Sequence, residues 1–195
     1  MKMIQSRGMV LNVENIDTDQ IIPAKFLKAT SREGFGEHLF SNWRYLENGD
    51  PNQEFILNTA PKNTAVLIAG NNFGCGSSRE HAAWAISDYG IRAIISSQFA
   101  DIFKGNALNN DIVPIELDPE ELKLVMGYVE KHPEATIEID IESQSVKVYN
   151  GNFLFEKKFA LDPLKKKFIM EDISELEYLL SIKKDVQAFE ELNVL

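Results

Sequence analysis

The chain has 195 residues, one cysteine and a formal net charge of −10. A chain of this length can bury a substantial core, and its hydrophobic fraction of 44% is ordinary for a globular protein. The acidic charge argues against a nucleic-acid partner, and the lack of an apolar run of about 18 residues argues against a membrane span. The first residues lack the apolar core of a secretion signal, and a single cysteine fits a reducing compartment, so we expect a cytoplasmic protein.

The first third of the chain predicts one strand followed by a turn and a long loop. Residues 3–13 alternate loosely between apolar and polar side chains, which indicates a strand. Asp and Asn cluster over residues 15–20, and Pro23 disfavours helix just before it, so a turn is expected there. Residues 24–61 show no periodicity and predict a packed loop with short helices. A loop of this length inside a compact domain is usually functional or part of an interface.

The centre of the chain predicts alternating strands and helices. Apolar runs at 64–69, 91–96 and 112–117 indicate buried strands, and segments 78–89 and 99–108 indicate the helices between them. Another helix is expected to begin after Asp118, because Pro119 suits a first helical position and Glu121 completes a capping-box pattern.

The last third predicts antiparallel strands and a C-terminal helix. Alternation over residues 136–160, with Asn150-Gly151 as a tight turn, indicates a β-hairpin subdomain. From Asp172 onward, apolar residues recur at helical spacing and predict one amphipathic helix. We therefore expect an α/β fold with a mostly parallel sheet, an antiparallel β subdomain and a C-terminal helix. Residues 1–170 would form the domain, and residues 171–195 a helical arm of that same domain.

The most informative stretch follows the strand at 64–69 and reads Asn71-Asn72-Phe73-Gly74-Cys75-Gly76-Ser77-Ser78-Arg79-Glu80-His81-Ala82. Two glycines allow a tight turn, and the helix after it would present free backbone N–H groups, two hydroxyls and an arginine. This combination predicts a socket for a carboxylate or a phosphate. The spacing of Ser77 and Glu80 also fits a capping box, so Ser77 as a plain helix cap is the competing interpretation.

The residues that could bind a metal are few. One Cys and three His are scattered singly along the sequence. A four-iron cluster or a structural zinc needs several thiolates or imidazoles at set spacings. We therefore expect no metal or cofactor on this chain, and any metal that the reaction requires must lie on another chain.

Three motifs stand in this order along the chain: Asn15-x-Asp17-Thr18-Asp19-x-Ile21-Ile22-Pro23, then Asn72 to Ala82 as quoted above, then Ser97-x-Phe99-Ala100-Asp101-Ile102-Phe103-x-x-Asn106. Together they resemble the small-subunit family of 3-isopropylmalate dehydratase. The stretch Gly34-Phe35-Gly36-x-His38-Leu39-Phe40-x-x-Trp43-Arg44 looks like the longer bacterial form of that subunit. The resemblance implies the three-layer swivelling β/β/α domain of the aconitase superfamily. It also implies a hydro-lyase of leucine biosynthesis that interconverts 2-isopropylmalate and 3-isopropylmalate through 2-isopropylmaleate. In that family a separate large subunit carries the 4Fe-4S cluster and this subunit is active only with it.

The resemblance also implies the roles of four residues near the socket. Ser77 would be the base that removes a proton next to a carboxylate of the small dicarboxylate substrate. Ser78 and Arg79 would bind a substrate carboxylate, and Asp19 would support the catalytic group.

Three further residues are expected to contact the substrate. Arg32 lies where aconitases place a second substrate-binding arginine, and Arg44 in the same loop is a competing candidate. Phe26 and Leu27 begin the loop that, in the family, faces the substrate's variable group, where an apolar lining suits an isopropyl substituent.

Other functions remain as alternatives. A related hydro-lyase subunit acting on citramalate or homoaconitate would share these motifs. A nucleotide-binding module is disfavoured because no lysine stands where a P-loop needs one, and G-x-G-x-x-G is absent. A serine hydrolase is disfavoured because the G-x-S-x-G elbow is absent.

Overall fold

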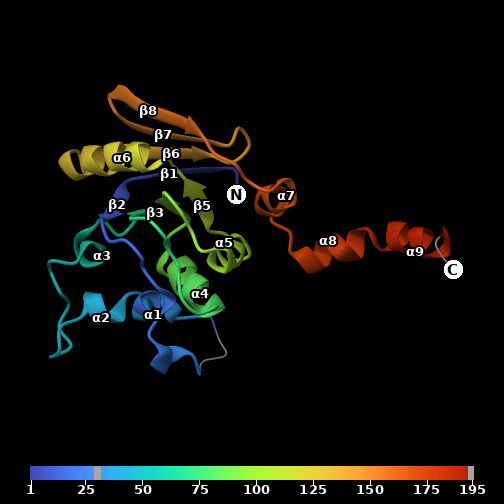
Figure 1. Ribbon diagram of the computed structural model, residues 1–195, viewed down its shortest axis with the longest axis horizontal. Coiled ribbons are helices and arrows are strands. Elements are labelled where there is room, and N and C mark those ends of the chain that lie inside the picture. Colours follow the sequence, from blue (N-terminus) through green and yellow to red (C-terminus); the bar gives the residue numbers. More distant parts are fainter. Residues whose placement is uncertain (29–31, 193–195) are drawn as a thin grey trace.

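Two four-stranded sheets and a layer of helices build the protein in its computed structural model, which describes residues 1–28 and 32–192 (Figure 1). The antiparallel sheet has the order β1-β6-β7-β8: β1 Met3–Ser6, β6 Thr136–Asp140, β7 Ser145–Asn150 and β8 Asn152–Lys158. The parallel sheet has the order β2-β3-β4-β5: β2 Gly8–Leu11, β3 Val66–Ala69, β4 Ala93–Ser96 and β5 Val113–Glu116. These layers confirm the predicted α/β fold with one parallel and one antiparallel sheet.

Helices cover both faces of the parallel sheet. Helix α6 and the antiparallel sheet share a core with one face, while α4 and α5 share a core with the other. The longer helices are α4 Glu80–Tyr89, α5 Asp101–Leu108, α6 Pro119–Lys131, α7 Pro163–Glu171, α8 Glu175–Ser181 and α9 Lys183–Leu192. The short ones are α1 Thr18–Ile21, η1 Ala24–Phe26, η2 Phe35–His38, α2 Ser41–Arg44 and α3 Ile56–Thr59. Among the described residues, none of these helices is both long and apolar enough to cross a bilayer.

The prediction of a single strand over residues 3–13 is wrong, because the chain changes sheets within it. Strand β1 pairs with β6 in the antiparallel sheet, and β2 pairs with β3 in the parallel sheet. Gly8 lies at the crossing, where a Cβ would stand 2.6 Å from the Ile137 side chain of one sheet and 3.1 Å from Ile68 of the other. A side chain at this position would force the ends of Ile137 and Ile68 to move, so glycine is favoured where the two sheets approach each other.

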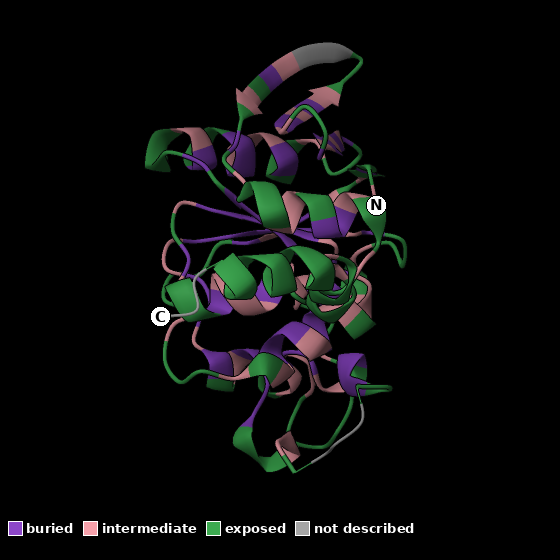
Figure 2. Cartoon of the chain, turned by 90° about the vertical axis from the view of Figure 1, so that its right-hand side faces the viewer, coloured by how far each residue is buried: buried purple, intermediate pink, exposed green. Residues whose placement is uncertain are grey.

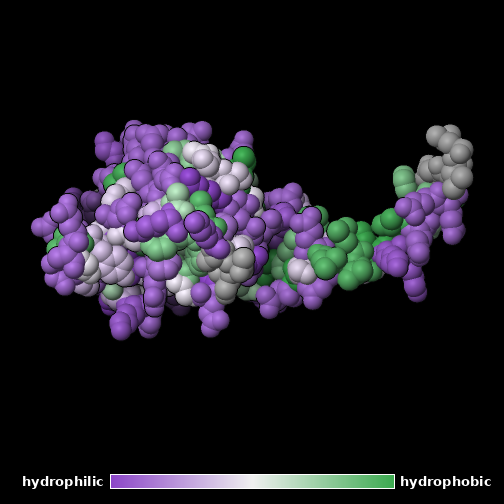
Figure 3. Space-filling model, turned by 90° about the horizontal axis from the view of Figure 1, so that it is seen from below, coloured by the Kyte–Doolittle hydropathy of each residue, from purple (hydrophilic) through white to green (hydrophobic). Residues whose placement is uncertain are grey.

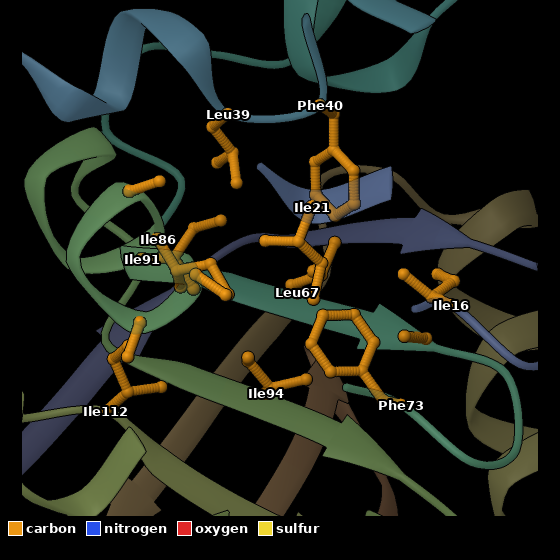
Figure 4. Close-up of a cluster of buried hydrophobic side chains, with 14 of the residues drawn as sticks. Ile16, Ile21, Leu39, Phe40, Leu67, Phe73, Ile86, Ile91, Ile94 and Ile112 are labelled. Carbon is orange, nitrogen blue, oxygen red and sulfur yellow. The ribbon is translucent and has the colours of Figure 1, made fainter. Parts of the chain in front are cut away.

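One core lies between the parallel sheet and the layer formed by α4, α5 and the 24–61 loop. Residues Leu67 and Ile94 of the sheet, Ile86 of α4 and Phe40 of the 24–61 loop all lie in it with no exposed surface (Figure 4). Figure 2 shows the same arrangement as buried strands between more exposed helices. Burying both faces of the parallel strands explains why their sequences are continuously apolar.

Two helix starts carry the same signal, and only one was predicted. Asp118 and Glu121 form the predicted capping box of α6. Asp162 caps α7 by accepting hydrogen bonds from the backbone of Leu164 and Lys165, and Pro163 follows it. The Asp-Pro pair at 162–163 was therefore a usable sign of a helix that the periodicity of the sequence did not suggest.

The predicted C-terminal helix is broken into α8 and α9. Helix α8 ends at Ser181, whose hydroxyl donates to the Tyr178 carbonyl at 2.6 Å. This bond competes with the helical backbone bond from Ile182 to the same carbonyl, which is longer at 3.2 Å. Serine side chains that bond back to the preceding turn often bend or end helices.

The 24–61 loop contains the short helices that the sequence predicted, and Arg44 holds it together. Its guanidinium donates to the carbonyls of Gly36, Glu37 and Leu39 and to the Asn58 side chain. Gly36 in turn donates to the Asp88 carboxylate of α4 at 2.8 Å. The loop is therefore packed onto α4 by hydrogen bonds as well as by apolar contacts.

Gly36→Ala should destabilise the fold by about 1–3 kcal/mol, the usual cost of overpacking. A Cβ at this position would lie 2.6 Å from the backbone nitrogen of Tyr89, which cannot move without disturbing α4. Gly127→Ala in α6 is the matched control, because its Cβ would meet no atom within 4 Å. Urea unfolding of both variants tests this. An unchanged midpoint for Gly36→Ala would contradict the close packing of loop on helix.

Candidate active site

Three segments meet at one edge of the parallel sheet. Strands β2, β3 and β4 run in the same direction, so their carboxyl ends lie side by side. The segment after β2 leads into α1, that after β3 forms the glycine-rich turn before α4, and that after β4 leads into α5. In parallel sheets, ligands bind in the crevice outside these ends.

Hydrogen bonds join the first of these segments to the glycine-rich turn. The Gly74 amide donates to the Ile16 carbonyl at 2.8 Å, and the Thr18 amide donates to the Cys75 carbonyl at 3.0 Å. The buried hydroxyl of Thr18 donates to the Ser77 carbonyl at 2.9 Å. The turn is thus held by residues about sixty positions earlier in the chain, which fixes where its serines lie.

The turn can take its shape only with glycine at position 74. Gly74 has φ +76°, and a Cβ there would lie 2.2 Å from the ring of Phe103 in α5. Both the backbone angle and the ring exclude a larger residue. The close approach brings the start of α5 against the turn.

A cavity of about 230 Å³ lies where these segments meet. Its wall includes Thr18, then Gly74 and Gly76 to Arg79 of the turn, then Ala100 to Phe103 and Asn106 of α5. Arg79 is the N-cap of α4 and Asp101 is the first residue of α5, so two helices begin at the cavity. The positive ends of their dipoles and their free N–H groups favour an anion in it.

The interpretation of Ser77 as a helix cap is wrong. Helix α4 begins at Glu80, two residues later than predicted, and its N-cap Arg79 is extended at φ −134° without a side-chain cap. Ser77 and Ser78 instead lie in the turn with exposed side chains. Within the described ranges 1–28 and 32–192, neither hydroxyl has a hydrogen-bond partner. Both hydroxyls are therefore available to a ligand.

Arg79 grips Asp19 across the edge of the cavity. Its guanidinium donates from two nitrogens to the two carboxylate oxygens of Asp19, one of the bonds being 2.7 Å long. This hydrogen bonding lowers the pKa of Asp19 and raises the pKa of Arg79. The Arg79 side chain is 14% exposed and that of Asp19 55%, so the cation is the anchored partner. Among the described residues, two of the five guanidinium N–H groups have a partner, which leaves three for a ligand.

The other predicted substrate contacts lie outside this cavity. Arg32 pairs with Glu80 at 3.4 Å and lies over the Trp84 ring, beside a neighbouring cavity of about 500 Å³. Phe26 and Leu27 pack against the loop side of the core, where Phe26 stacks on His38. None of these three residues lines the cavity at Arg79.

Several residues of the cavity wall were given no role from the sequence. Thr18 was singled out only as a member of the first family motif, and the structure shows that its hydroxyl donates to the Ser77 carbonyl. Ile102 is 58% exposed on the wall, and Asn106 stands beside it. The signal for both was the third family motif, which contains them and had no role assigned.

Cys75 lies in the turn but is not poised for chemistry. Burial, and then the nearby Asp17 carboxylate, raise the pKa of its thiol above the usual value. A raised pKa leaves little thiolate at neutral pH, so the cysteine is a packing residue. Over the part of the chain that the structure describes, no three His, Cys, Asp or Glu residues are grouped so that they could hold a metal ion.

Comparison with known proteins places this geometry in a family. Residues 2–120 match the aconitase C-terminal domain. The chain is 49% identical to the 3-isopropylmalate dehydratase small subunit of Christiangramia forsetii over 181 residues, which cover 93% of this chain and 87% of that one. It is 48% identical to the small subunit of Karelsulcia muelleri, covering 97% and 95% of the two chains.

A solved structure shares the fold as well. The crystal structure of 3-isopropylmalate dehydratase from Methanocaldococcus jannaschii superposes with a TM-score of 0.68 at 28% identity, covering 96% of this chain and 99% of that one. Sequence and fold therefore agree over nearly the full length of the chain. This chain belongs to the 3-isopropylmalate dehydratase small-subunit family of the aconitase superfamily.

Proposed function

We propose that this chain, together with a large subunit, interconverts 2-isopropylmalate and 3-isopropylmalate by dehydration and rehydration through 2-isopropylmaleate, a step of leucine biosynthesis. The observation that supports this best is the cavity in which two exposed hydroxyls stand beside a guanidinium with open donors. The names of the relatives favour this substrate over citramalate or homoaconitate.

Arg79 and Ser78 bind a carboxylate of the substrate. The end of the guanidinium is occupied by Asp19, so the substrate carboxylate approaches the remaining N–H groups. A planar guanidinium matches a carboxylate with two parallel bonds, which a lysine cannot do. Asp19 acts as the positioning residue, because it fixes the plane in which Arg79 presents those donors.

Ser77 removes the proton from the carbon next to the bound carboxylate. That proton is slightly acidic, since the carboxylate can accept part of the negative charge that develops when the C–H bond breaks. A serine hydroxyl is a weak base unless its deprotonated form is stabilised. The starts of α4 and α5 and the charge of Arg79 provide that stabilisation at the cavity. In the hydration direction Ser77 returns the proton to carbon.

The large subunit assists the departure of the hydroxyl group. The chain has one cysteine and three histidines, which do not suffice for a four-iron cluster. We therefore propose that the large subunit carries the 4Fe-4S cluster and that the pair works in the cytoplasm, as a single cysteine suits a reducing compartment. The roles assigned to Ser77, Ser78 and Arg79 do not depend on how the cluster is held.

The second substrate contact is Arg32 rather than Arg44. The Arg44 guanidinium already donates to loop carbonyls. Arg32 is exposed and pairs with Glu80, the residue after Arg79. Phe26 and Leu27 supply an apolar surface on the same loop, which faces the substrate once the large subunit closes over it. We also propose that residues 1–170 form the swivel domain and that residues 171–195 are its helical arm.

Ser77→Ala should lower kcat of the reconstituted pair by at least about a hundredfold with little change in KM, the usual loss when a general base is removed. Isomerisation is measured with each subunit alone and with both together. Ser143→Ala, on the far antiparallel sheet, is the control and should retain full activity. Normal activity of Ser77→Ala, or full activity of this chain alone, would refute the proposal.

Arg79→Lys should raise KM about tenfold to a hundredfold, because it removes a charged bidentate contact and keeps the charge. Initial rates over a range of 2-isopropylmalate concentrations separate KM from kcat. An unchanged KM would show that the substrate carboxylate binds elsewhere.

Asp19→Asn should lower stability at neutral pH by at most about 1 kcal/mol, since the carboxylate is largely exposed and its pairing is screened. The folded pKa of Asp19 is depressed, so its stabilisation is fully present above the unfolded pKa and is lost as pH falls through the folded pKa. Urea unfolding at pH 7 and pH 3 should therefore show a difference from the unsubstituted protein that is smaller at pH 3. Glu47→Gln, an exposed loop residue, is the control; an Asp19→Asn difference that does not shrink between pH 7 and pH 3 would contradict the ion pair.

A further inference from the structure

Helices α8 and α9, residues 175–192 of the C-terminal arm, project away from the body of the molecule (Figure 1). Twelve large hydrophobic side chains are exposed among the described residues, and six of them belong to this arm. They are Leu176, Leu179, Leu180, Val186, Phe189 and Leu192. Figure 3 shows apolar surface over the part of the arm that adjoins the body. Such a concentration of apolar surface marks an interaction site.

The arm is attached to the body at its base, where the Tyr178 ring of α8 packs on Phe168 of α7 and Lys165 pairs with Glu175 at 3.4 Å. Helices α8 and α9 have seven and ten residues, and neither contains a buried residue in the described part of the chain. Figure 2, in which the arm faces the viewer, shows its helices as exposed almost throughout. Isolated helices this short are marginal in water, and amphipathic helices are normally stabilised by packing of their apolar face. A second surface must cover this face.

We propose that the arm binds the large subunit and that its apolar face lies in a groove of that partner. This inference deepens the proposed function, on which it rests, by stating where the large subunit is held. The base of the arm lies beside the active site: Glu175, Leu176 and Glu177 line the cavity of about 500 Å³ that Arg32 and Glu80 also line. Glu80 directly follows Arg79, so a partner that covers the active site also meets the arm.

The charge of the arm defines the chemistry of the groove. Glu190 and Glu191 stand in the last turn of α9, where no basic residue balances them. Carboxylates at the end of a helix oppose its dipole, so they do not serve the stability of the helix. The groove in the large subunit is therefore apolar, with lysine or arginine at the rim that meets the end of the arm.

Charge also argues against a second copy of this chain as the occupant. Each chain has a net charge of −10, so two copies of it repel each other as they approach. Like charges placed together across an interface oppose association. A large subunit with a basic rim meets no such penalty.

Leu179→Asp tests this inference with Leu124→Asp as its matched control. The two side chains are 51% and 53% exposed, but Leu124 lies on α6, away from the arm. Neither substitution should change the urea midpoint of the isolated chain, because neither side chain is buried. Leu179→Asp should weaken association with the purified large subunit by about thirtyfold or more, the loss typical of an apolar residue at the centre of an interface. Leu124→Asp should leave association unchanged.

The measurements are sedimentation velocity of the mixed subunits and isomerisation at a large excess of the large subunit. At saturation, Leu179→Asp should regain normal turnover, because the arm holds the partner and takes no part in the chemistry. Normal association of Leu179→Asp would overturn the inference. A loss of self-association of the isolated chain, with unchanged binding of the large subunit, would overturn it in favour of a second copy. A third outcome separates the two proposals. If Leu179→Asp weakens association but the unsubstituted pair does not isomerise 2-isopropylmalate, the proposed function is refuted and the role of the arm stands.

Discussion

The site depends on the attachment of two segments about sixty residues apart. The backbone of Thr18 binds the Cys75 carbonyl and its hydroxyl binds the Ser77 carbonyl, while Arg79 grips Asp19. These bonds form only if β2 and β3 are parallel and in register, because register decides which residues leave the sheet at the same level. Each of these bonds also restricts the conformations that the turn can adopt. The turn is therefore held by its backbone groups, and the serine hydroxyls remain exposed.

The parts of the fold that could be read from the sequence are those governed by local patterns. Continuous apolar runs identified β3, β4 and β5, since strands buried on both faces need no polar side chains. The division between β1 and β2 could not be read, because the alternation of residues continues across it. The division becomes visible only in the pairings, since β1 pairs with β6 and β2 with β3, and Gly8 lies between Ile137 of one sheet and Ile68 of the other.

The site shows the same division between local and distant causes. Ser77, Ser78 and Arg79 could be singled out because they are neighbours in a glycine-rich turn before a helix. The true start of α4 could not be predicted, because the Ser77 carbonyl accepts a hydrogen bond from Thr18. No local spacing in the sequence reveals this contact. Our proposal of Arg32 over Arg44 could not come from the sequence either, since both lie in one aperiodic loop and the sequence does not show that Arg44 donates to loop carbonyls.

The Arg79–Asp19 pair keeps its arginine in place without a contribution from another chain. A guanidinium that is mostly buried needs a counter-charge, and Asp19 provides one within the same chain. Because the arginine is the buried member and the carboxylate the exposed one, the arginine keeps its position while groups on the solvent side change. A substrate carboxylate can then add to the open N–H groups without reorganising the turn. Preorganisation of this kind lowers the cost of binding, since the donors are aimed before the ligand arrives.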